Sequence, residues 1–214
     1  ELNSFHLRLE TDITVDSFGL DNPIGRSVHA AANEEITAIV PFTEIQTLAR
    51  GYWPEPQGIM IRGVPRDWLE RDRGAAQQME IPVGQFDLSD PNGIVLGTEL
   101  SRALGVRVGD TLAVTHIPAG GSRPAEVELR VTGLFRSGYL EFDRSWGFVS
   151  LSSAANVLDA RDPVVYGLKV SDRFDVERVA VQLRRALPEV TVATWRAFNR
   201  GIFSALRMEK SMMV

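Results

Sequence analysis

The order of expected strands and helices is similar at the two ends of the chain and changes in the middle. Hydrophobic periodicity and turn residues predict, toward the N-terminus, a strand, a helix and three extended segments, over residues 11–15, 23–33, 35–42, 44–50 and 59–64. Toward the C-terminus they predict a βαβ unit, over residues 164–170, 174–187 and 190–193. The two end segments are expected to pair in one sheet. The stretch between them, about residues 64–163, is therefore expected to be an insertion.

A β-rich pattern fills this middle stretch. Residues 126–135 alternate between apolar and polar side chains, which predicts a strand with one face on a core and one in water. A helix over residues 99–104 is expected to end at Gly105, because glycine is common just beyond a helix C-terminus. Further elements are a helical turn over 65–71, strands over 94–96, 106–114 and 146–151, and a helix capped by Ser152-Ser153 that runs through Leu158. Together these elements predict an α+β fold.

Both ends of the chain read as helices without the usual boundary signals. Residues 198–214 become more apolar as they proceed, and no capping residue closes them at the C-terminus. Residues 1–10 place Leu2, Phe5 and Leu9 on one side and begin without an N-cap residue. Two interpretations stay open: a free protein with frayed terminal helices, or a domain taken from between two membrane-spanning helices. In the second case both ends are expected to leave the domain on the same side.

The composition is that of a globular domain and argues against several classes of protein. Of 214 residues, 44% are hydrophobic and 24% are charged. No run approaches the roughly 20 consecutive apolar residues of a membrane-spanning helix. The net charge is -5 and the arginines are scattered, which argues against nucleic acid as a partner. Cysteine is absent, so disulfides, thiolate catalysis and cysteine metal sites are excluded.

Residues typical of catalytic or metal sites are sparse. His6, His29 and His116 lie in three different segments, without the spacing that places two metal ligands on one helix face. Ser152-Ser153 lacks the Gly-x-Ser-x-Gly turn of a serine nucleophile, and the chain has no phosphate-binding loop or dinucleotide-binding motif. We therefore expect no catalytic residue, no metal site and no bound cofactor, and we do not expect an enzyme.

A connection longer than a tight turn needs joins two expected strands of the middle stretch. Pro118 and Pro124 restrict its ends, while Gly120-Gly121 loosens its tip. Ile117 is an apolar side chain that could insert into a groove of a partner. A plain hairpin loop without a partner fits the same residues, so both interpretations stay open.

Several short motifs resemble the periplasmic domain of the LolC/LolE lipoprotein-releasing permeases. They lie at residues 63–65, 93–100, 104–110, 131–135 and 203–213, and the last is the most specific. The resemblance covers nearly the whole chain. It implies the MacB-like periplasmic fold of the MacB/FtsX-like permease superfamily, with a βαβ-based porter subdomain and an inserted, β-rich sabre subdomain. The implied limits are 1–63 and 164–197 for the porter subdomain, 64–163 for the sabre subdomain, and 198–214 for the start of the second transmembrane helix.

The same resemblance implies transport without catalysis in this domain. Family members are ABC transporter permeases of the bacterial inner membrane, and this domain faces the periplasm. They work with a second permease copy and a cytoplasmic ATPase subunit of the LolD type. They release lipoproteins from the membrane and pass them to a periplasmic carrier of the LolA type. The alternative is another MacB/FtsX-like permease, which exports other cargo or regulates cell-wall hydrolases.

In LolC a protruding hairpin, the hook, receives the carrier, and the matching stretch here supplies the candidate binding residues. They are Ile117, Pro118, Ala119, Gly120, Gly121, Ser122, Arg123, Pro124 and Glu126. This hairpin is shorter than the LolC hook, and Glu126-Val127 stands where LolC has a Gln-Arg pair. The closing motif is closer to LolC and the hairpin closer to LolE, which fits a permease that combines both roles as a homodimer.

Overall fold

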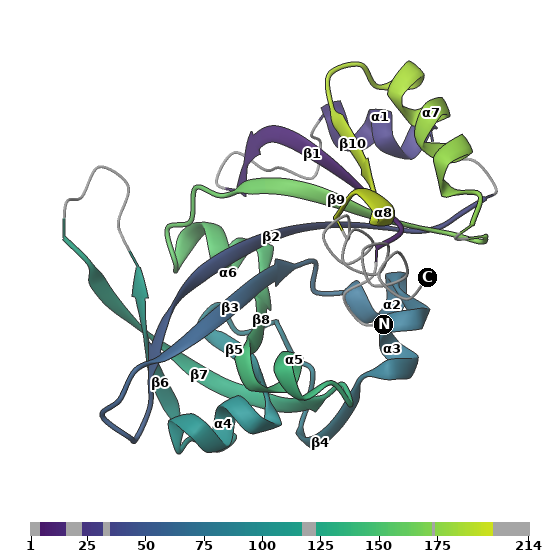
Figure 1. Ribbon diagram of the computed structural model, residues 1–214. Coiled ribbons are helices and arrows are strands. Elements are labelled where there is room, and N and C mark those ends of the chain that lie inside the picture. The colour runs from purple at the N-terminus through teal and green to yellow at the C-terminus, as the bar shows by residue number, and fades with distance from the viewer. Residues whose placement is uncertain (1–4, 16–22, 32–34, 117–122, 173, 199–214) are drawn as a thin grey trace, which may run out of the picture. The chain divides into compact units, whose positions relative to one another are not determined.

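The computed structural model describes residues 5–15, 23–31, 35–116, 123–172 and 174–198 (Figure 1). The protein has the predicted α+β fold, and contacts divide the described chain into two compact units. The barrel unit contains residues 40–164 together with 12–15. The end unit contains residues 5–11, 23–31, 35–39 and 165–198. The limits at residues 64 and 163 that the family resemblance implies stay a proposal.

Three long strands each contribute residues to both units. They are β1 (Leu7–Thr14), β2 (Ile36–Arg50) and β9 (Pro163–Val170). Strand β2 runs without interruption through Pro41, where the sequence had indicated two separate extended segments.

The end unit is a sheet covered by helices. Besides the three shared strands it contains α1 (Pro23–Ala31), α7 (Val176–Ala186), β10 (Thr191–Thr194) and α8 (Trp195–Phe198). Its strands lie in the order β10-β1-β9-β2, which confirms that the two ends of the chain pair in one sheet. Helix α7 buries Val176, Val179, Ala180 and Leu183, which form one stripe at helical spacing.

The helix expected over residues 1–10 is wrong for the part that the structure describes. Leu7 begins strand β1, whose register places Leu7 and Leu9 opposite residues of β10. Phe5, Leu7 and Leu9 are buried and alternate with more exposed residues, which is the period of a strand. The helix expected over 198–214 lies, beyond its first residue, outside the described residues.

The barrel unit contains most of the strands and several short helices. Its strands besides β2 are β3 (Gln57–Val64), β4 (Glu80–Gly84), β5 (Gly93–Gly97), β6 (Thr111–His116), β7 (Ala125–Arg136) and β8 (Trp146–Ser150). Its helices are α2 (Trp68–Arg71), α3 (Arg73–Gln78), α4 (Thr98–Leu104), α5 (Leu140–Ser145) and α6 (Leu151–Asn156). The sequence did not indicate β4, α3 or α5. The other elements were expected, within a few residues of these bounds.

Six strands of this unit close into a ring. The pairs are β2-β3, β3-β8, β8-β5, β5-β7, β7-β6 and β6-β2, so the last strand returns to the first (Figure 1). The seam between β6 and β2 is short, with Ala49 opposite Val114 and Arg50 opposite Ala113. A closed ring leaves its strands with few free edges. Strand β4 lies outside the ring and pairs with β7.

The two faces of β8 support two parts of the core. Around Phe148 gathers an aromatic cluster whose neighbouring ring centroids lie 4.6 to 6.1 Å apart. Its other members are Trp68, Phe86, Phe135, Phe142 and Trp146. On the opposite face a Cβ at Gly147 would lie 3.0 to 3.2 Å from Ile59, Ile94 and Leu96. Glycine at this position therefore lets the aliphatic side chains approach the strand.

Two helix boundaries test the predicted caps. Gly105 follows α4 with φ 70, in the left-handed region, which confirms it as the C-terminal glycine. The N-cap of α6 is Ser150, whose side chain accepts a hydrogen bond from the backbone N–H of Ser153. The prediction that Ser152-Ser153 forms this cap is wrong. An N-cap side chain binds the amide three residues on, and Ser153 supplies that amide.

Candidate functional site

Strands β6 and β7 form the hairpin that carries the candidate residues. They pair in antiparallel register, and His116 opposite Ala125 is the last pair before the connection. Along β7, Leu129 and Val131 are buried while Glu128 is exposed. This burial pattern confirms the predicted alternation, with one face of the strand on the core and one in water.

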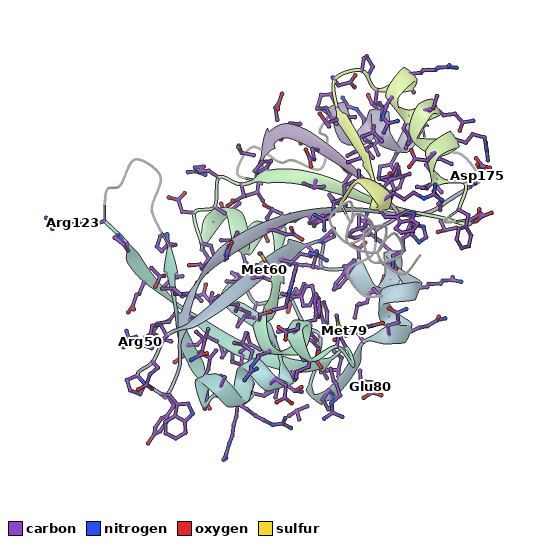
Figure 2. The ribbon with its side chains drawn as sticks, in the orientation of Figure 1. Arg50, Met60, Met79, Glu80, Arg123 and Asp175 are labelled. Carbon is purple, nitrogen blue, oxygen red and sulfur yellow. The ribbon has the colours of Figure 1, made fainter. Side chains whose placement is uncertain are left out.

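Three of the nine candidate residues lie in the described part of the chain. Arg123 is exposed just before β7 (Figure 2). Pro124, which follows it, and Glu126, near the start of β7, are exposed as well. The other six, Ile117, Pro118, Ala119, Gly120, Gly121 and Ser122, lie outside the described residues. The structure thus places the base of the hairpin, and the joint role of the nine residues stays a prediction.

The base of the hairpin is tied to the ring. Arg50 Nη2 at the end of β2 lies 2.6 Å from Glu126 Oε2. Their side chains are 48% and 50% exposed, so this ion pair contributes at most about 1 kcal/mol to stability. The Thr47 hydroxyl also donates a hydrogen bond to the Thr115 carbonyl oxygen. One of the three described candidates, Glu126, is therefore already paired within the domain.

The loop between β2 and β3 presents two exposed aromatic side chains that the sequence reasoning missed. Tyr52 and Trp53 are 77% and 48% exposed, and their rings meet edge to face with centroids 5.0 Å apart. The backbone N–H of Trp53 donates to the Leu104 carbonyl oxygen at 3.3 Å, and a Cβ at Gly105 would lie 2.5 Å from the indole nitrogen Nε1 of Trp53. The loop is thus fixed on the end of α4. Two adjacent aromatic residues inside a Gly/Pro-rich loop were the signal that could have found it.

The described residues offer no metal site. Within those ranges no group of three or more His, Cys, Asp or Glu side chains lies close enough together to hold a metal ion. His6 has a structural contact, since its Nδ1 accepts a hydrogen bond from the Val170 N–H at 2.9 Å. In the same part of the chain, no helix has the length and apolar character needed to cross a membrane.

Sequence comparison relates the chain to one kind of membrane protein. No family model matches the chain. It is 29% identical over 227 residues to the lipoprotein-releasing system transmembrane protein LolC of Xylella fastidiosa, covering 100% of this chain and 53% of that protein. It is 30% identical over 190 residues to LolC of Neisseria meningitidis, covering 83% of this chain and 44% of that protein. The resemblance to LolC is confirmed, and the chain spans about half the length of the curated relatives it matches.

Solved structures show the fold. The extracellular domain of the noncanonic ABC-type transporter YknZ from Gram-positive bacteria superimposes with a TM-score of 0.54 at 12% identity, covering 88% of this chain and 100% of that one. The periplasmic region of MacB from Actinobacillus actinomycetemcomitans gives a TM-score of 0.53 at 13% identity, covering 92% and 91%. This chain has the MacB-like periplasmic fold. Together with the LolC likeness, the MacB-like fold supports a periplasmic domain of an ABC transporter permease.

Proposed function

We propose that this chain is the periplasmic domain of a lipoprotein-releasing ABC transporter permease of the bacterial inner membrane. The domain itself performs no catalysis. A cytoplasmic ATPase subunit of the LolD type supplies the energy, and a second permease copy completes the membrane complex. The domain passes released lipoproteins to a periplasmic carrier of the LolA type. The likeness to LolC along the full chain is the observation that carries this proposal.

The β6–β7 hairpin is the part of the domain that we assign to carrier docking. Ala113 and Val114 are the residues of β6 whose backbone pairing with β2 is described. Beyond them β6 pairs with β7, and the Thr115 carbonyl oxygen accepts a hydrogen bond from the Thr47 hydroxyl of β2. Arg123 and Pro124, just before β7, are exposed and available to a partner. A base of paired strands, with exposed residues just before β7, suits a docking element.

Titration of the 214-residue chain with the LolA-type carrier of the same organism tests this assignment. We expect saturable binding in the micromolar range, which Ile117→Asp weakens about tenfold by placing a charge where an apolar contact is proposed. Glu128→Ala is the matched control, because Glu128 is exposed on β7 and lies outside the candidate set. It is expected to leave binding unchanged. Absence of binding at high micromolar concentration, by a method that detects weak complexes, would count against carrier docking.

A second candidate function is that of another MacB/FtsX-like permease, which exports other cargo or regulates cell-wall hydrolases. The fold favours it, because solved domains of the transporters YknZ and MacB superimpose on this chain with TM-scores of 0.54 and 0.53. Depletion of the full-length protein separates the two functions. Lipoproteins retained in the inner membrane support the first, and normal lipoprotein localisation supports the second.

A further inference from the structure

Exposed apolar side chains gather where strand β2 ends. Among the residues that the structure describes, eight large apolar side chains are exposed, and three of them lie within six consecutive residues. These three are Leu48, Tyr52 and Trp53, with exposed fractions of 47%, 77% and 48%. We call them the apolar strip. Single exposed apolar side chains are common on any protein surface, whereas a group of them marks a surface of contact.

The apolar strip begins beside the base of the β6–β7 hairpin. The pair of Ala49 and Val114 puts Leu48, in the continuation of that register, level with Thr115, one residue from the last pair of the hairpin. Arg50 turns to the same exposed side of β2 as Leu48, because alternate residues of a strand share a face. It forms the ion pair with the hairpin base that is described above. The strip and the hairpin are therefore neighbours on one surface of the barrel unit.

A protein that covers the base of the hairpin also reaches the strip. Arg50 is level with Ala113, three residues before the end of β6, which is about 10 Å at the rise of a strand. Tyr52 follows Arg50 after one residue. A standard interface covers about 800 Å² of each partner, or about 30 Å across if it is round. In contrast, the exposed Tyr139 follows the other end of β7, roughly 35 Å along that strand from Ala125.

The strip is held in place before any partner binds. Trp53 is fixed on the end of α4 by its backbone hydrogen bond to Leu104, and only glycine at position 105 leaves room for its indole ring. The ring of Tyr52 meets this indole edge to face. Side chains that are already fixed lose little conformational entropy when a partner covers them. Tyrosine and tryptophan are also the residue types that often supply most of the binding energy of an interface.

We propose that the apolar strip is a second docking contact for the periplasmic carrier that the β6–β7 hairpin receives. This inference rests on the proposed function, because it names the same partner. An apolar part of the carrier surface packs on Leu48 and Tyr52 while the hairpin is bound. A partner held at one place can turn about that place, whereas two separate contacts fix its orientation. The strip thus sets the direction in which the carrier faces the domain.

Titration of the 214-residue chain with the LolA-type carrier of the same organism tests the second contact. Tyr52→Ala removes the most exposed ring of the strip and is expected to weaken binding about tenfold. Leu48→Thr keeps a residue that suits a strand and is expected to weaken binding about threefold. Tyr139→Ala is the matched control, because Tyr139 is 53% exposed in the same unit but lies beyond the opposite end of β7. It is expected to leave binding unchanged.

The outcomes separate the strip from the proposed function. Binding that Ile117→Asp weakens, but that Tyr52→Ala and Leu48→Thr leave unchanged, overturns the second contact and leaves hairpin docking in place. Absence of carrier binding by the unchanged chain contradicts both. Equal weakening by Tyr139→Ala also overturns the second contact, since any exposed ring would then have the same effect. Circular dichroism verifies that each variant is folded, and Leu48→Thr alone decides if Tyr52→Ala does not fold.

Sedimentation velocity tests another occupant of the strip, a second copy of this chain. The unchanged chain without carrier is expected to sediment as a monomer over the concentrations used in the titration. Dimers that form in the unchanged chain and are lost in Tyr52→Ala would assign the strip to self-association, and would overturn its role in carrier docking.

Discussion

At the scale of single residues, Arg62 on β3 has the most unusual environment, because its side chain is fully buried. Its guanidinium carbon lies 4.7 Å from the ring centroid of Phe42 and 4.6 Å from that of Trp146. Glu44, opposite Arg62 in the β2–β3 register, accepts hydrogen bonds from Nε and Nη2. A buried charge beside a carboxylate and two aromatic faces depends strongly on each of them.

Substitution of either member of this pair is expected to have unequal effects. Glu44→Ala leaves the guanidinium buried without its carboxylate and is expected to lower the free energy of unfolding by about 3 kcal/mol. Arg62→Met removes the buried charge, and Glu44, whose side chain is 26% exposed, can then turn to water. The expected loss is therefore smaller, about 1 kcal/mol. Urea denaturation measures both losses, and a larger loss for Arg62→Met would contradict this account.

A second residue-scale prediction concerns pH. Burial raises the pKa of Tyr166 from 10.0 to about 12. Between these values the folded chain keeps a proton that the unfolded chain has released, so the free energy of unfolding falls as the pH rises. Denaturant titrations across this interval should show a shallower fall for Tyr166→Phe than for the unchanged chain. Identical slopes would mean that another group causes the fall.

At the scale of elements, Gly105 both ends α4 and supports the aromatic loop. It has φ 70, and a Cβ there would meet the Trp53 indole ring, whereas Gly109 has φ 95 and open space around such a Cβ. Gly109→Ala therefore measures backbone strain alone, which is expected to cost about 1 kcal/mol. Gly105→Ala adds displacement of Trp53, and is expected to cost about 1 to 3 kcal/mol more. Thermal unfolding gives the stabilities, and tryptophan fluorescence should change for Gly105→Ala alone. Equal losses would show that the indole moves aside freely.

The elements that sequence reasoning identified are those with a strong periodic pattern. Helix α7 and strand β7 have one clear apolar face each, and both were found. Strand β4 is exposed along most of its length and contains Pro82, so no alternation marks it. Helix α3 buries only Ala75 and begins where Asp72 accepts a hydrogen bond from the Ala75 N–H. Elements of this kind depend on neighbouring segments more than on their own pattern.

The first described residues show two patterns in competition. Leu2, Phe5 and Leu9 are spaced as on a helix, whereas Phe5, Leu7 and Leu9 are spaced as on a strand. The strand forms because β9 and β10 lie on either side of β1, and a single sequence does not reveal such partners. The candidate hairpin was recognisable from its prolines and glycines. The contact of Glu126 with β2 was not, because it depends on closure of the ring.

At the scale of the whole molecule, closure of the ring predicts which fragments fold. A fragment of residues 40–164 contains the paired part of all six ring strands, whereas residues 64–163 lack β2 and nearly all of β3. We expect the longer fragment to unfold cooperatively on heating and to show near-ultraviolet circular dichroism from packed tryptophans. The shorter fragment leaves β8 and β6 with open edges and is expected to do neither. Cooperative unfolding of both fragments would show that the ring can be opened without loss of the fold.

The hairpin of β6 and β7 has a consequence for how proteins of this shape diverge. The part of each strand near Ala113 belongs to the wall of the ring, while the part near His116 extends past the described seam with β2. Residues can therefore be added or lost at the far end in descendants without breaking any pair of the ring. Natural selection can thus adjust the length of the hairpin while the architecture that supports it is inherited unchanged.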